Sequence, residues 1–165
     1  MSSGALFSSA AACAPNSGVT GQAGNILFKP LSRVSGVRLV TLQQHTDKEE
    51  VRKVGSPKTV TDLTEFLDSE TWGLMDTAAI IQNLELVITC DTMVAHLAAA
   101  LGKETWILLA QIPDWRWGTT GSTSPWYPDT VRLFRRPEVG LWETFIRTVV
   151  AKALDTRFNP PPGAP

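Results

Sequence analysis

The residues best suited to chemistry lie at one corner of the chain, where Asp91 and Thr92 follow an apolar run at 86–90. Apolar residues spaced by three and four over 94–101 predict a helix directly after them, and a second apolar run follows at 106–109. This order predicts a parallel strand–helix–strand unit with a right-handed crossover. Its Asp-Thr corner joins a strand's carboxyl end to a helix N-terminus, where unpaired N–H groups favour anions such as phosphate.

Two interpretations of this corner stay open from the residues alone. In the first, Asp91 is only the N-cap of the helix, a role that typically contributes about 1 kcal/mol. In the second, Thr92 and the N–H groups after it hold a diphosphate, while Asp91 turns toward a sugar hydroxyl or caps the helix. His96 lies four residues after Thr92 and so shares its helix face, although a lone helical histidine is more often a satisfied or surface residue.

The loop at 110–130 is the second candidate region, because loops of this length inside a compact domain are usually functional or disordered. Its aromatic and charged residues include Asp114, Trp115, Arg116, Trp117, Trp126 and Tyr127. These side chains either form a lid that packs on the domain's own edge or line a sugar or base pocket. Arg135 and Arg136 follow the loop at the end of the last predicted strand; they could meet phosphate, but a charged strand end is the commoner explanation.

Composition limits the classes of function. The chain has 165 residues, 43% of them hydrophobic, and a net charge of -1, which predicts one globular domain and argues against a dedicated nucleic-acid binder. No apolar run approaches the roughly 20 residues of a membrane span. Cys13 and Cys90 lie far apart in different contexts, so we expect no disulfide framework and a cytoplasmic location. Dinucleotide, P-loop, serine-hydrolase and zinc-hydrolase motifs are missing from the sequence, and we expect no metal and no cofactor.

Alternating strand and helix patterns predict the fold class and its boundaries. Residues 1–25, rich in Ser, Ala and Gly, are expected to form a flexible leader, 26–155 the domain, and 156–165 an extended tail. Strands are predicted at 37–42, 60–63, 86–90, 106–109 and 131–135, and helices at 46–54, 76–84, 94–101 and 142–154. Asp76 is the expected cap of the second helix, and Phe145, Val149 and Ala153 the buried stripe of the last. The pattern predicts an α/β fold, a Rossmann-like parallel sheet with helices on both faces.

Several segments together resemble a known family. Residues 76–84, the block LVITCDTMVAHLAAALGKETWILL, and the motifs PDWRWG, SPWYP and VRLFRR are similar to the C-terminal domain of GT-B glycosyltransferases. The likeness is closer to the glycosyltransferase domain that follows tetratricopeptide repeats in many bacterial proteins. That domain is related to the heptosyltransferases of glycosyltransferase family nine and, more distantly, to the O-linked N-acetylglucosamine transferases. The resemblance covers roughly residues 27 to 154.

The resemblance implies one half of a GT-B fold that binds a nucleotide-diphospho-sugar donor, without a metal or cofactor. The donor-binding positions that it implies are Asp91, Thr92, Met93, His96 and Gln43. The aromatic loop would add a pocket lid from Asp114, Trp115, Arg116 and Trp117. Met93 stands where heptosyltransferases commonly have glycine.

The same resemblance implies a second Rossmann-like domain, N-terminal to this one, that holds the acceptor and usually the catalytic base. This sequence shows the leader in its place, so we expect an incomplete site with no assigned catalytic residue, and an isolated chain that binds rather than turns over. Three hypotheses stay open: an inverting glycosyltransferase domain, a non-catalytic nucleotide-sugar-binding module, and a degenerate fragment without activity. A separate N-terminal half or a tetratricopeptide-repeat protein would be the protein partner.

Overall fold

The computed structural model describes residues 5–7, 28–41, 48–56, 59–63, 73–137 and 142–161. In chain order, the strands are β1 (Ala5–Phe7), β2 (Leu39–Thr41), β3 (Val60–Asp62), β4 (Leu86–Cys90), β5 (Thr105–Leu109) and β6 (Val131–Arg135). The helices are η3 (Leu31–Arg33), α1 (Lys48–Val54), α2 (Leu74–Gln82), α3 (Met93–Ala100), η5 (Trp115–Trp117), α4 (Trp142–Phe145), η6 (Ile146–Val150) and α5 (Ala151–Phe158). All pairs between these strands are parallel, which confirms the predicted α/β class.

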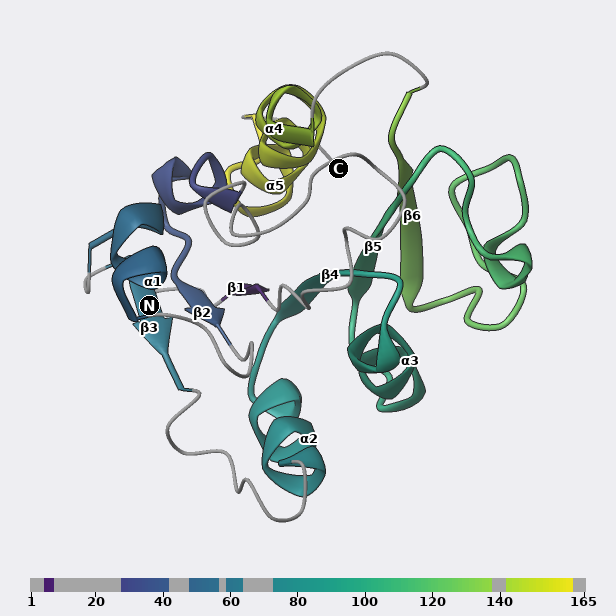
Figure 1. The fold of residues 1–165 in the computed structure, drawn as a ribbon, viewed down its shortest axis with the longest axis horizontal. Coiled ribbons are helices and arrows are strands. Elements are labelled where there is room, and N and C mark those ends of the chain that lie inside the picture. The colour runs from purple at the N-terminus through teal and green to yellow at the C-terminus, as the bar shows by residue number, and fades with distance from the viewer. Residues whose placement is uncertain are drawn as a thin grey trace.

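The strands follow the winding order of a Rossmann-like sheet. One sheet has the order β1-β4-β5-β6, the pair β2-β3 forms another, and β2 lies against β1. In space the order is therefore β3-β2-β1-β4-β5-β6 (Figure 1). The direction of winding reverses between β1 and β4. In open α/β sheets, ligands bind outside the carboxyl ends of the strands at such a switch point.

Strand β1 is an element that the sequence did not predict. It lies inside the expected leader at 1–25, and Ala5 to Phe7 pair with Leu86 to Ile88. Local composition gives little sign of a three-residue strand whose partner lies some eighty residues away. The rest of 1–25 is outside the described residues.

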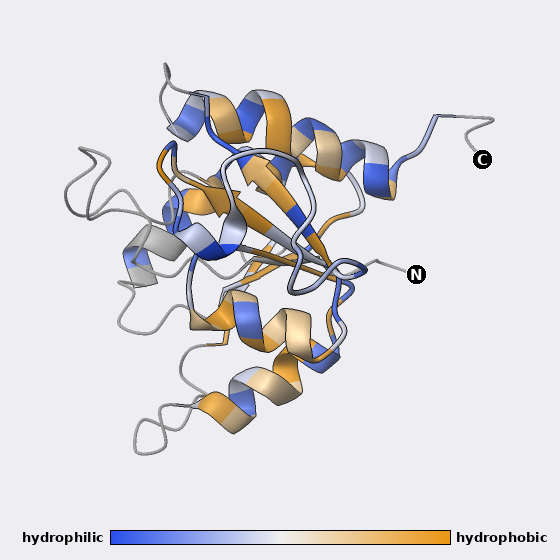
Figure 2. Cartoon of the chain, turned by 90° about the vertical axis from the view of Figure 1, so that its right-hand side faces the viewer, coloured by the Kyte–Doolittle hydropathy of each residue, from blue (hydrophilic) through white to orange (hydrophobic). Residues whose placement is uncertain are grey.

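Helices cover both faces of the sheet. β4 and β5 are buried at every position, as expected of parallel strands with helices on both sides. Leu86, Ile88 and Trp106 pack with the C-terminal helix, and Ile107 packs with Ala95 of α3 on the opposite face. Figure 2 shows this separation, with the C-terminal helix above the sheet and α2 and α3 below it.

The predicted Asp76 cap is wrong, and so is the first of the two open interpretations of Asp91, that of an N-cap. α2 begins at Leu74 after Gly73, whose φ of 57° is left-handed, so Asp76 lies in the first turn instead of capping it. The N-cap of α3 is Thr92, with extended backbone, and not Asp91. Residue type alone favoured Asp in both cases, whereas the backbone conformation decides where a helix starts.

The C-terminal helix corrects another prediction. Ile146 to Val150 form a π-helical turn, which takes up one residue more than an α-helical turn. Val150 is therefore buried at 0% exposure, while Val149, predicted on the buried stripe, is 44% exposed. The helix also continues to Phe158, so the first residues of the predicted tail at 156–165 are helical.

Cys90 is buried at the end of β4 and is disulfide-bonded, so the prediction of no disulfide is wrong. The cysteines therefore no longer support a reducing compartment. In the described ranges, none of the helices is long and apolar enough to cross a membrane. The same residues contain no group of three or more His, Cys, Asp or Glu side chains that could hold a metal ion.

Candidate functional site

The corner after β4 leaves the start of α3 without a side-chain cap. Thr92 has φ -148° and ψ 170°, and its hydroxyl lies 3.2 Å from the hydroxyl of Thr89 instead of bonding the helix. The first turn closes where the N–H of Ala95 donates to the carbonyl of Thr92 at 3.0 Å. The N–H groups of Met93 and Val94 precede that bond, so they can donate to an anion in front of the helix.

The other predicted donor-binding residues take different positions. Asp91 is exposed at the mouth of the corner, and Met93 is the first residue of α3 with 59% of its surface exposed. Gln43 lies outside the described residues.

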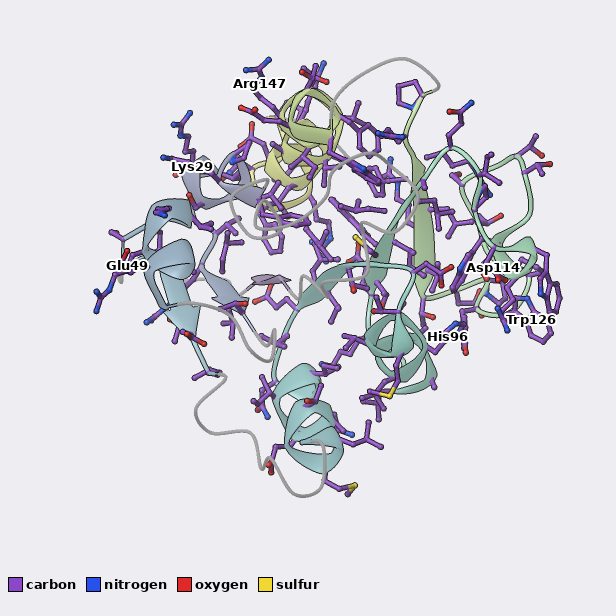
Figure 3. All side chains as sticks on the ribbon, in the orientation of Figure 1. Lys29, Glu49, His96, Asp114, Trp126 and Arg147 are labelled. Carbon is purple, nitrogen blue, oxygen red and sulfur yellow. The ribbon has the colours of Figure 1, made fainter. Side chains whose placement is uncertain are left out.

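His96 connects α3 to the aromatic loop. Its ring stacks on Trp117, with 5.0 Å between ring centroids and 24° between planes, and its Nδ1 lies 3.2 Å from the Tyr127 hydroxyl. The structure therefore brings the two predicted regions together through this side chain. In Figure 3, His96, Asp114 and Trp126 lie on one side of the molecule, away from Lys29 and Glu49.

The expected lid at 114–117 divides into exposed and buried parts. Trp117 is 1% exposed and belongs to the core, whereas Trp115 is 72% exposed. Trp115 meets Trp126 edge-on at 6.2 Å, and the Arg116 guanidinium lies 5.1 Å above the Trp115 ring. The indole N–H of Trp126 donates to the Arg116 carbonyl at 3.1 Å. The exposed rings are therefore fixed to each other on the outer surface of the loop.

Asp114 starts the short helix η5 and acts as its cap. Its Oδ1 accepts from the backbone N–H of Arg116 at 3.0 Å and from the Arg116 guanidinium at 2.7 Å. The backbone hydrogen bond is the largest cause that holds the pKa of Asp114 below its ordinary value. The carboxylate therefore stays ionised and keeps η5 in place.

Arg135, at the end of β6, has a role that the sequence did not reveal. Its guanidinium group donates to the carbonyls of Trp117, Gly118, Thr120 and Gly121 at 2.6 to 3.0 Å. The loop also bonds β6 directly, because the N–H of Leu133 donates to the Ser122 carbonyl at 2.7 Å. One side chain thus fixes the loop that presents the exposed tryptophans. The only sequence signal was the arginine's place at a strand end.

Trp117 carries one unusual polar group. Its indole N–H is buried and has no hydrogen-bond partner among the described residues. A buried donor of this kind costs about 1–3 kcal/mol until an acceptor reaches it. The His96 ring stacks on the same indole.

The fold and this corner define a Rossmann-like α/β domain with an uncapped helix start beside its switch point. No protein-family model matches the chain. It is 29% identical over 137 residues to Protein FlbA of Caulobacter vibrioides, an alignment that covers 78% of this chain and 21% of FlbA. The chain therefore spans about a fifth of the length of that relative.

Proposed function

We propose that this chain is the nucleotide-diphospho-sugar-binding domain of a GT-B-type glycosyltransferase. The observation that carries the proposal is the start of α3, where the N–H groups of Met93 and Val94 lack a side-chain cap beside the sheet's switch point. Helix N-termini at such crevices suit a diphosphate, because the dipole and the N–H groups both favour negative charge.

In this proposal each part of the site has a task. The N–H groups of Met93 and Val94 bind phosphate oxygens and stabilise the charge that develops on the leaving nucleoside diphosphate. Asp91, exposed at the same corner, accepts from a sugar hydroxyl. The contacts of His96 with Trp117 and Tyr127 fix the loop relative to α3. The acceptor and the base that deprotonates it would be supplied by a second domain or partner chain.

A second candidate is a non-catalytic nucleotide-sugar-binding module. The part of the chain that the structure describes holds one Rossmann-like domain, whereas a GT-B active site lies between two such domains. The two candidates share the donor site and differ in turnover. Assays of donor hydrolysis and sugar transfer, with and without a candidate N-terminal half or a tetratricopeptide-repeat protein, separate them.

Substitution of Met93 tests the donor site directly. Proline at this position removes one N–H but fits the first residue of a helix, and the extended backbone of Thr92 suits the residue before proline. Alanine at the same position removes the side chain and keeps the N–H. Calorimetric titration with UDP-, GDP- and ADP-sugars then measures the effect of the N–H alone.

We expect Met93→Pro to weaken binding by about 10- to 100-fold, the effect of one hydrogen bond to a charged group. Met93→Ala should change it by less than about threefold, since no N–H is lost. Equal effects of the two substitutions would place the ligand elsewhere. Absence of binding by every nucleotide sugar at millimolar concentration would remove both candidate functions.

A further inference from the structure

A groove separate from this corner lies between the sheet and the C-terminal helix. It has a volume of about 540 Å³, within the range of ligand-binding clefts. Glu104, just before β5, and Arg132, the second residue of β6, line it, so it opens near the amino ends of the strands. The Asp91 corner follows the carboxyl end of β4, and none of its residues lines the groove.

The π-helical turn shapes one wall of this groove. Because η6 shifts the helix register by one residue, Val150 packs in the core and Val149 lines the groove. Ala153 and Thr156 continue the same wall one and two turns further on. From Thr148 to Thr156 this wall is about 12 Å long, the span of roughly four extended residues. π-helical turns occur frequently at functional sites.

The floor of the groove is aromatic. Trp106 and Phe134 line it with ring centroids 4.8 Å apart, and the Arg132 guanidinium lies 4.8 Å above the Phe134 ring. The Trp106 indole N–H donates to Glu104 Oε1 at 3.0 Å, and Arg157 bonds the other oxygen of that carboxylate at 3.1 Å. Glu104 is thus neutralised within the groove.

The remaining charge at the groove is positive. Arg132 and Lys152 line opposite walls, one on β6 and one on α5, and neither has a carboxylate partner among the described residues. Val149 and Ala153 lie on the same wall as Lys152. The groove therefore combines an apolar strip with two cations, one on each wall, that have no carboxylate partner among the described residues.

We propose that this groove binds an acidic polypeptide segment. An apolar side chain of the segment lies against Val149 and Ala153, and carboxylates on either side of it pair with Arg132 and Lys152. The open shape, the length of the helix wall and the placement of the two cations on opposite walls favour an extended chain over a compact anion, which needs donors that converge on one point. This proposal is independent of the nucleotide-sugar site.

The test uses the full chain, labelled with ¹⁵N, and the blocked peptide Ac-EELFEE-amide. The Trp106 indole N–H is the reporter, because it bonds Glu104 at the edge of the groove. Two matched peptides, Ac-KKLFKK-amide and Ac-EEGSEE-amide, change the charge or the apolar pair alone. ADP and vesicles containing phosphatidylglycerol test a small anion and a membrane surface as other occupants.

We expect Ac-EELFEE-amide to shift the Trp106 resonance and to bind more weakly as salt is raised, while both matched peptides bind at least about fivefold more weakly. Lys152→Glu should weaken binding by about three- to tenfold. Arg147→Glu is the matched control, since Arg147 is exposed on the same helix and does not line the groove (Figure 3). It should change affinity by less than about twofold.

Several results would overturn the proposal. One is the absence of any Trp106 shift with the acidic peptide at about 5 mM. Binding weaker than this would be too weak for specific recognition. Another is an equal loss of affinity in Lys152→Glu and Arg147→Glu, which would show only a general charge effect. A Trp106 shift with ADP or vesicles at concentrations where the peptide has none would assign the groove to a different ligand.

Discussion

Replacing Arg135 with methionine removes the group that fixes the aromatic loop and keeps most of the side chain's apolar stem. The bond from Nη2 to the Trp117 carbonyl is partly buried, and the bonds to Gly118, Thr120 and Gly121 are exposed. A shielded hydrogen bond from a charged donor contributes about 1.5–3 kcal/mol, and each exposed one contributes about 0.5 kcal/mol. We therefore expect a loss of about 3–4.5 kcal/mol, with only a small share from the exposed bonds because their carbonyls can still bond water.

Two measurements check this value. Urea unfolding should show the lower free energy, with a melting temperature lower by about 2–4 °C for each kcal/mol lost. If the loop opens locally instead, hydrogen exchange of the amides at 117–130 should accelerate by about tenfold for each 1.4 kcal/mol of loop stability that is lost. Either outcome agrees with the role given to Arg135.

A matched variant gives the baseline. Arg147→Met also replaces an arginine with methionine, but at an exposed helix position, and should change stability by no more than about 0.5 kcal/mol. If Arg135→Met is no more destabilising than Arg147→Met, and exchange in the loop is unchanged, then the four bonds do not hold the loop.

The same contacts lead us to expect three further outcomes. Asp114 has its pKa lowered from the ordinary 3.8, so its stabilisation of η5 is present above that pH and is lost as pH falls through the lowered value. Carboxyl NMR should show a midpoint below 3.8, and an unshifted midpoint would contradict the cap. Val150→Ala should lower the free energy of unfolding in urea by about 2 kcal/mol, and Val149→Ala should lower it by less than about 0.5 kcal/mol. The reverse order would contradict the π-helical register. His96→Ala should accelerate hydrogen exchange at Tyr127 and Trp117, whereas Lys103→Ala should not; equal effects would mean that His96 does not join α3 to the loop.

The sequence predicted the segment from β4 to β6 well, because local hydrophobic patterns define its strands and the helix α3. The predicted bounds of β4, β5, β6 and α3 differ from the observed bounds by at most one residue. Their order along the chain then implied the parallel sheet with helices on both faces. The placement of the Asp91 and Thr92 corner followed from those elements.

The features that the sequence missed depend on contacts between distant parts of the chain. β1 needs β4 as its partner, and the four carbonyls held by Arg135 lie 14 to 18 residues before it. Trp115 and Trp117 are the same residue type two positions apart, yet one is 72% exposed and the other 1%. No local pattern distinguishes them, since burial of Trp117 depends on its packing against His96 and the core.

The π-helical turn belongs to the same group of features. A regular period of 3.6 residues placed Val149 in the core, and a single additional residue in one turn was enough to expose it. The exposed Val149 side chain then forms part of the wall of the groove between the sheet and the C-terminal helix. A prediction that assumes a regular α-helix over 142–154 therefore misses both the shift in helix register and the groove.

An amide NMR titration of the chain with UDP-, GDP- and ADP-sugars tests the proposed donor site most directly. If the donor diphosphate binds the start of α3, at least one of these sugars shifts the amides of Met93 and Val94 first and most, with smaller shifts at His96 and the loop. Shifts that leave the start of α3 unchanged, or no shift with any nucleotide sugar at millimolar concentration, would contradict the proposed donor site.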